Sequence, residues 1–198
     1  MLTSLKIPRS PVAHIPSGRL FRAPSVSCTL VPLGARRMIE LHEVSVIDAP
    51  VHRCFDLARS VEVHLLDNSH FGEPTVVVDG QTSGLVGIGH QVTWRARHLG
   101  VRQDLTTCIT GFDPPLFFQD TMVRGAFHSM QHDHYFRPLT RDRTEMTDVL
   151  RVTAPLPVVG RVAELLVLRR YMRNLLLDRS TVTKRIAESA EWQRYLPH

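Results

Sequence analysis

The sequence has few cysteines, which limits the kinds of covalent or metal stabilisation available to it. Cys28, Cys54 and Cys108 are the only three among 198 residues, and no Cys-x-x-Cys pair occurs. An odd and widely spaced set argues against a disulfide framework and against a structural zinc site. We therefore expect a protein of a reducing compartment and predict a cytoplasmic location.

Several signatures of well-defined activities are also missing. No apolar run approaches the ~20 residues that a membrane-spanning helix needs. Gly84, Gly87 and Gly89 are not followed by the Lys-Ser/Thr of a phosphate-binding loop, and no Gly-x-Ser-x-Gly occurs. Zinc-finger, helix-turn-helix and RNP-like motifs are absent as well. The sequence thus predicts neither a nucleic-acid partner nor stable membrane insertion.

Acidic residues are missing from residues 1–37, which carry six basic side chains and are rich in Pro and Ser. This segment accounts for the formal net charge of +5, because the rest of the chain is almost neutral. It shows no periodicity, so we predict a disordered basic extension at 1–37 and one folded domain at 38–198. A targeting segment remains an alternative. The strand pattern that begins directly after Met38 favours an extension upstream of the true start.

From Met38 onward the hydrophobic pattern indicates a sequence of short elements. "MIELHEVSVI" alternates and predicts a strand. "DAPVHRCFDLAR" predicts a helix with Asp48 as its N-cap, and a second short helix follows at 61–66. Closely spaced strands come next, and one long helix ends the chain. We expect the strands at 90–99, 102–112, 116–124, 131–137 and 144–153, and the helix at 158–192.

This order predicts an α+β fold with one layer of sheet and one long helix. Consecutive strands with short connections form an antiparallel meander, here of about six to seven strands. Such a sheet curves round the C-terminal helix, with two short helices near the start. Because one helix cannot fill the concave side, we expect a mostly apolar cavity between the layers.

Several local motifs accompany this order of elements. Residues 89–94 read Gly-x-x-Val-x-Trp in outline, residues 115–117 carry a Pro-Phe turn, and "APLPVVG" at 154–160 leads into the last helix. With the opening strand and "HDHYF", these pieces resemble the START-like, helix-grip superfamily (SRPBCC), in its polyketide cyclase/dehydrase and lipid-transport branch. The resemblance covers residues 38 to about 192. It implies a cavity for a hydrophobic or amphipathic small molecule, but it does not imply one chemistry.

The stretch "SMQHDHYF" contains the most distinctive polar residues. His132 and His134 share one face of a strand, whereas Asp133 points to the other. A hairpin turning near residues 139–141 would place His132 opposite Asp148 and His134 opposite Met146. The preceding hairpin could bring Asp120 near His134.

These residues support three interpretations. In a cavity, His132, His134 and Asp148 could act as a general acid–base cluster of a cofactor-free cyclase or dehydratase. A structural or ligand-orienting role is the favoured alternative, since buried polar groups are normally paired. A metal site with Asp120 or Asp148 as third ligand carries less weight, because neither Glu-x-x-His nor cysteine accompanies the histidines. We therefore predict no metal and no cofactor.

A second set of side chains is expected to contact the ligand. These residues are Trp94, His98, Asp120, Phe136, Met146, Arg169 and Met172. Arg169 is included because it lies on the apolar stripe of the last helix and could meet a ligand carboxylate. The other arginines of this helix predict a solvated face more than a surface for a protein or anionic membrane. The predicted function is binding of a lipid or polyketide-like molecule, with catalysis as the alternative.

Overall fold

The computed structural model describes residues 38–66, 75–98, 101–153 and 161–196, which belong to one compact unit, Gly34–His198. The predicted extension at 1–37 and the link at 154–160 lie outside the described residues. The elements in chain order are β1 (Met38–Ile47), α1 (Val51–Ala58), α2 (Val61–Leu66), β2 (Val76–Gly80), β3 (Gln91–His98), β4 (Val101–Asp113), β5 (Phe117–Arg124), β6 (Ser129–Thr140), β7 (Arg143–Thr153), α3 (Arg161–Glu188) and the 3-10 helix η2 (Ala190–Arg194).

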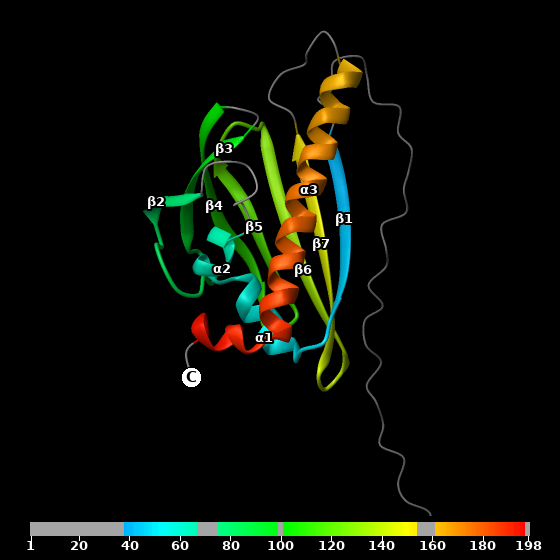
Figure 1. Ribbon diagram of the computed structural model, residues 1–198. Coiled ribbons are helices and arrows are strands. Elements are labelled where there is room, and N and C mark those ends of the chain that lie inside the picture. The colour runs from blue at the N-terminus through cyan, green and yellow to red at the C-terminus, as the bar shows by residue number, and fades with distance from the viewer. Residues whose placement is uncertain (1–37, 67–74, 99–100, 154–160, 197–198) are drawn as a thin grey trace, which may run out of the picture. The chain divides into compact units, whose positions relative to one another are not determined.

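The seven strands form one antiparallel sheet in the order β1-β7-β6-β5-β4-β3-β2. Strands β2 to β7 are a continuous meander, and β1 pairs with β7, so β1 and β2 are the edges. The sheet curves round α3, which crosses its concave side, while α1 and α2 lie beside the lower part of α3 (Figure 1). The predicted α+β, helix-grip architecture is confirmed.

Alternation of side chains explains why β1 adopts this position. Ile39, Leu41 and Ile47 are buried, and the residues between them are exposed or half-buried.

At the other edge, β2 ends at Gly80, whose φ of +83° and close approach to the Gln91 carbonyl exclude a larger side chain. An added Cβ there would lie only 2.2 Å from that oxygen.

Two helix ends differ from the sequence-based expectation. The N-cap of α1 is Pro50, not Asp48, and it makes no side-chain capping hydrogen bond. Helix α3 ends at Glu188, not at Trp192, because Ser189 is extended and caps the following 3-10 helix. The Ser189 hydroxyl accepts a hydrogen bond from the Glu191 amide at 3.2 Å, which starts η2 in a new direction.

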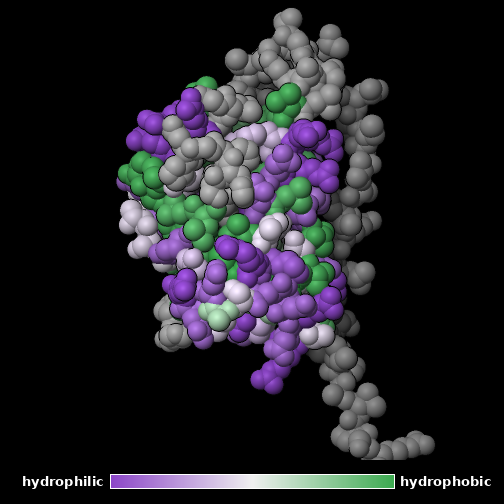
Figure 2. All heavy atoms as spheres, viewed as in Figure 1, coloured by the Kyte–Doolittle hydropathy of each residue, from purple (hydrophilic) through white to green (hydrophobic). Residues whose placement is uncertain are grey.

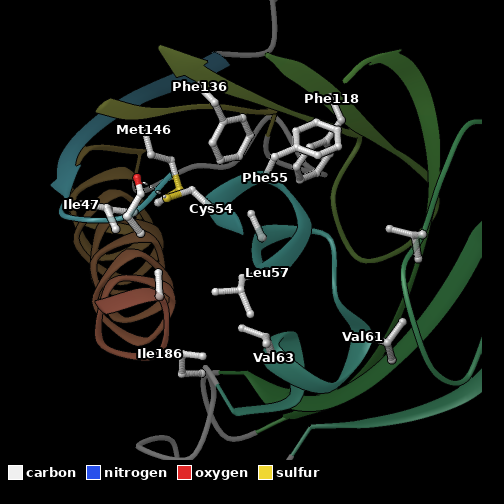
Figure 3. Close-up of a cluster of buried hydrophobic side chains, with 14 of the residues drawn as sticks. Ile47, Cys54, Phe55, Leu57, Val61, Val63, Phe118, Phe136, Met146 and Ile186 are labelled. Atoms are coloured by element: carbon white, nitrogen blue, oxygen red, sulfur yellow. Dashed lines mark hydrogen bonds between the residues drawn. The ribbon is translucent and has the colours of Figure 1, made fainter. Parts of the chain in front are cut away.

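The main hydrophobic core lies where α1 meets the sheet and the C-terminal part of α3. Phe55 of α1 contacts three aromatic rings, those of Phe112, Phe118 and Phe136, at centroid distances of 5.6, 5.7 and 5.5 Å. Figure 3 shows Phe55, Phe118 and Phe136 gathered on one side of α1, with Ile186 of α3 on the other. This core joins α1, the sheet and the C-terminal part of α3.

The convex face of the sheet carries ion pairs between neighbouring strands. Arg95 binds Asp104 through two hydrogen bonds, and Arg137 binds Glu145 in the same way. The surface of α3 toward the viewer is mainly hydrophilic (Figure 2), and Arg169, with several other arginines of this helix, is exposed. In the described part of the chain, no helix has the length and apolar character to cross a membrane.

Candidate functional site

A cavity of about 150 Å³ lies between the concave side of the sheet, α2 and α3. Most of its wall is apolar, as expected for inward-facing strand residues, and includes Val92, Ala96, Leu105, Ile109, Leu150 and Leu176. Polar side chains also line it, among them His64, Thr75, Trp94, Asp120, His132 and Arg179. The cavity therefore combines apolar walls with groups that can form hydrogen bonds.

Four of the residues that the sequence singled out line this cavity. They are Trp94, Asp120, His132 and Met172. Trp94 extends from β3, where Val92 and Ala96 share its face, and its indole Nε1 donates to Thr107 Oγ1 at 3.3 Å. The alternation of the predicted strand was sufficient to place these three side chains together.

Three of the other predicted contacts lie elsewhere. Phe136 and Met146 are buried in the main core with Phe55, not in the cavity wall (Figure 3). Arg169 is exposed on α3. The side chain of His98 is outside the described part of the structure. The structure therefore does not bring Phe136, Met146 or Arg169 to the cavity wall.

The two histidines share the inward face of β6 as predicted, but their cross-strand partners differ. His134 lies opposite Asp148, where Met146 was predicted. His132 lies opposite Leu150, where Asp148 was predicted. The hairpin turn is centred one residue later than expected, and this moves every pairing by two residues while keeping each side chain on its face. On the other side, Asp120 pairs with His132.

These four residues form one buried cluster. His134 Nε2 and Asp120 Oδ2 are hydrogen-bonded at 3.2 Å, and His134 Nδ1 lies 2.5 Å from Asp148 Oδ1. His132 Nε2 is 3.2 Å from the same Asp148 oxygen, and its Nδ1 is 3.9 Å from Asp120. The two contacts to Asp148 have the distance of ion pairs but not the alignment of hydrogen bonds.

Aromatic contacts hold the imidazoles in place. The His134 ring stacks on Phe118 at a centroid distance of 4.1 Å, and the His132 ring lies 3.8 Å from that of His134. His134 is only 1% exposed and Asp148 2%, so both lie behind the cavity wall. His132 and Asp120 are the members of the cluster that border open space.

The charges of the cluster are strongly coupled. Burial alone raises the pKa of Asp120, but the hydrogen bond from His134 and the nearby positive charges lower it to about 2. Burial likewise opposes ionisation of Asp148, yet the charge of His134 lowers its pKa. Burial and the charge of His134 lower the pKa of His132. At His134 burial acts to lower the pKa, but the charge of Asp148 and the hydrogen bond with Asp120 outweigh it and raise the pKa overall.

Asp133 does not belong to this cluster. It lies on the convex face, where Arg151, Gln119 and Gln131 donate hydrogen bonds to it at 2.5, 2.7 and 3.0 Å. Although burial raises the pKa of its carboxyl, the hydrogen bond from Arg151 lowers it overall. Asp133 thus has a complete set of partners in the sheet surface, as its position in the alternating pattern indicated.

Two cavity residues were not recognised from the sequence. His64 of α2 faces Trp94 at a ring-centroid distance of 4.0 Å, and burial lowers its pKa well below the usual value. Arg179 of α3 lines the cavity, and its Nη2 donates to the Ala58 carbonyl at 3.2 Å. Their signals were present, because His64 follows the buried Val61 by three residues and Arg179 follows Leu176 by three.

No protein-family model and no curated protein matches the sequence, but many solved structures share the fold. An aromatase/cyclase from a Streptomyces species has 15% identity and a TM-score of 0.59, covering 77% of this chain and 94% of that one. A START superfamily protein from Mycobacterium smegmatis has 12% identity and a TM-score of 0.55, covering 75% and 97%. Norcoclaurine synthase from Thalictrum flavum has 10% identity and a TM-score of 0.51, covering 75% and 96%.

These similarities define the class of fold. The chain has the helix-grip fold of START-like proteins, as the sequence motifs had indicated. At such low identity the likeness shows the fold alone, so the function must be argued from the residues of this chain.

Proposed function

We propose that the protein binds a small hydrophobic or amphipathic molecule in the cavity between the sheet and α3. The observation that carries this proposal is the composition of the wall, which is apolar over most of its area and has polar groups at His64, Asp120, His132 and Arg179. Sites for small molecules combine apolar walls with a few polar groups that fix orientation. The same fold in a START superfamily protein and an aromatase/cyclase supports this proposal.

The volume of the cavity favours a ligand with about one ring. A cavity of about 150 Å³ in another protein accepts benzene, and drug-sized pockets measure about 300–1,000 Å³. The cavity here is also about 150 Å³. A single ring or short chain with a hydroxyl, carbonyl or carboxyl group fits it, whereas a long lipid or a multi-ring polyketide requires the cavity to widen.

The two tryptophans of the chain allow a direct test. Trp94 lines the cavity, and Trp192 lies in η2, where the Arg53 guanidinium covers its ring. A Trp192→Phe variant therefore reports on the cavity through Trp94 alone. We expect a saturable change in its fluorescence with phenol or benzoate, and native mass spectrometry of the purified chain to show any bound molecule. A Trp94→Phe variant, which keeps Trp192, is the control and should give no such change.

Failure of the binding proposal is equally clear in this experiment. If no molecule copurifies and neither ring compounds nor fatty acids of increasing length change the Trp94 signal saturably, the cavity is not a ligand site. A response that is equal in the Trp94→Phe control would indicate binding outside the cavity.

One observation favours a second candidate function, cofactor-free cyclisation or dehydration of a carbonyl compound. His132 and Asp120 border the cavity, and His134 and Asp148 support them from behind. An imidazole that meets open space and is positioned by carboxylates can transfer protons to or from a bound substrate. In this candidate His132 touches the substrate, whereas His134 and Asp148 position it.

The test of this second candidate uses a single-ring β-hydroxy ketone, whose dehydration is followed by absorbance. We expect His132→Gln to abolish turnover while the Trp94 response to the compound remains. If the unmodified chain gives no turnover above the buffer rate with this class of compound, the enzyme candidate fails and the binding proposal is unaffected.

A further inference from the structure

We propose that Asp120, His132 and His134 form a binding site for a divalent first-row transition-metal ion, with its open side toward the cavity. This goes beyond the binding of a small molecule, does not depend on it, and departs from the sequence-based prediction of no metal. A metal ion on His132 would replace the cofactor-free proton transfer considered above. Each of the three residues offers one ligand atom, and these atoms all lie within 4.8 Å of one another. Two imidazoles and one carboxylate are a donor set that suits zinc and non-haem iron.

The distances between the donor atoms are close to those of a metal site. Asp120 Oδ2 lies 3.2 Å from His134 Nε2 and 3.9 Å from His132 Nδ1. Ligands at about 2.0–2.1 Å from a tetrahedral ion are roughly 3.3 Å apart. Small rotations of the side chains are therefore enough to bring the three atoms to an ion, and β5 and β6 hold their backbones in adjacent register.

Asp148 occupies the place of a supporting carboxylate. Its Oδ1 lies 2.5 Å from His134 Nδ1 and 3.2 Å from His132 Nε2, the ring nitrogens that face away from Asp120. Histidines that bind metals commonly donate their other N–H to such a group, which fixes the tautomer and the ring orientation. Neither contact is aligned as a hydrogen bond in the present arrangement. The rotation of the two imidazole rings that would bring their donor nitrogens to an ion also changes their two contacts with Asp148.

Charge and access agree with the proposal. Two carboxylates, Asp120 and Asp148, balance a divalent ion while both imidazoles stay neutral. Asp120 and His132 line the cavity, so the fourth position of the ion faces open space, as in catalytic rather than structural zinc sites. Arg179 lines the same cavity, and its positive charge acts against a cation, so the site is expected to bind less tightly than it would without this arginine.

The experiment uses the full chain, treated with a chelator, dialysed and then titrated with Co²⁺ or Zn²⁺ alone. We expect one tightly bound ion per chain by elemental analysis, and visible d–d absorption from Co²⁺. Crystals soaked in Zn²⁺ should give an anomalous peak within about 2.0–2.2 Å of Asp120, His132 and His134. Absence of that peak at full soak, or one-to-one binding at some other place, would overturn the proposal without any variant.

Variants separate this site from histidines on the surface. Asp120→Asn and His134→Gln should abolish the Co²⁺ spectrum, and Asp148→Asn should weaken binding about 10- to 100-fold. The exposed His42 and His52 provide the matched control, because their double replacement by alanine should leave the spectrum unchanged. Arg179→Met should tighten binding.

Two results would contradict the proposal even if some variants fold poorly. One is an undiminished Co²⁺ spectrum in a folded Asp120→Asn chain, and the other is loss of the spectrum in the His42/His52 control. The Trp94 response to phenol, measured on the metal-free chain, distinguishes failure of the metal site from failure of the small-molecule proposal.

Discussion

Asp133 lies on the convex face of β6, whereas its neighbours His132 and His134 lie on the inward face. A substitution at Asp133 tests this separation. The Asp133 carboxylate is 3% exposed and accepts hydrogen bonds from Arg151, Gln119 and Gln131. Asp133→Ala removes the charged acceptor that these three half-buried donors share, which we expect to cost about 1–3 kcal/mol in the free energy of unfolding. We expect urea unfolding to show this loss and the Trp94 response to phenol to stay unchanged.

The exposed pair Arg137–Glu145 on the same face is the control for Asp133. Replacement of Glu145 by alanine should cost less than about 1 kcal/mol, because exposed ion pairs contribute little. If Asp133→Ala instead removed ligand binding and left stability intact, the assignment of this residue to the sheet surface would be wrong.

Two arginines of α3 allow a comparison of the same substitution at inward and outward positions. Arg179 reaches the cavity and Arg169 is exposed. A hydrogen bond to a charged group contributes about 1.5–3 kcal/mol, so Arg179→Met should weaken benzoate binding roughly 10- to 100-fold. Arg169→Met should have no effect, and phenol binding should change less than benzoate binding. Equal effects of the two substitutions on the Trp94 titration would contradict this placement.

The sequence predicted the strand face of each residue correctly, but it did not predict the cross-strand partners. Strand alternation correctly placed His132 and His134 inward and Asp133 outward, but a turn centred one residue later changed their partners by two positions. On α3, Arg169 and Arg179 lie on the same stripe, about 15 Å apart along the axis. Helical periodicity cannot distinguish them, because the position of the cavity along the axis depends on how the sheet curves.

At the level of elements, helix α1 packs on the sheet through one aromatic side chain. Phe55 is 2% exposed and packs against the rings of Phe118 and Phe136 (Figure 3). Phe55→Ala should lower the free energy of unfolding by about 3–5 kcal/mol, because it leaves a cavity in the core. Urea unfolding followed by circular dichroism measures this loss.

A matched substitution on β1 indicates whether the loss comes from packing. Val44 is 56% exposed, and Val44→Ala should change stability by no more than about 0.5 kcal/mol. A loss below 1 kcal/mol for Phe55→Ala would mean that α1 is not an essential part of the core.

The number and order of elements followed from local sequence, whereas some of their ends did not. Each strand from β3 to β7 alternates over enough residues to be recognised alone, and the short turns make neighbours in sequence neighbours in the sheet. The end of α3 depends on one capping interaction of Ser189. Since Trp192 continued the helical spacing, the hydrophobic pattern gave no sign of that end.

At the scale of the whole molecule, the cavity lies beneath a seven-stranded sheet that is wider than one helix can cover. The described part of the chain forms two separate hydrophobic clusters, one around Phe55 and one around Leu150 and Met172. The cavity borders both clusters, and each cluster is packed without it. If the cavity is a binding site, a side chain that fills it should abolish ligand binding and leave folding intact.

Ala96→Phe tests this distinction directly. Ala96 is buried on β3 and lines the cavity, so a phenyl ring at this position occupies the volume of a one-ring ligand. For the unmodified chain, phenol at 100 times its Kd should raise the unfolding temperature by roughly 5–10 °C. The variant should keep its cooperative transition and show no such rise. Val123→Phe, at an exposed position of β5, should retain the full rise in unfolding temperature. A rise in Ala96→Phe equal to that of Val123→Phe would place the ligand elsewhere on the molecule.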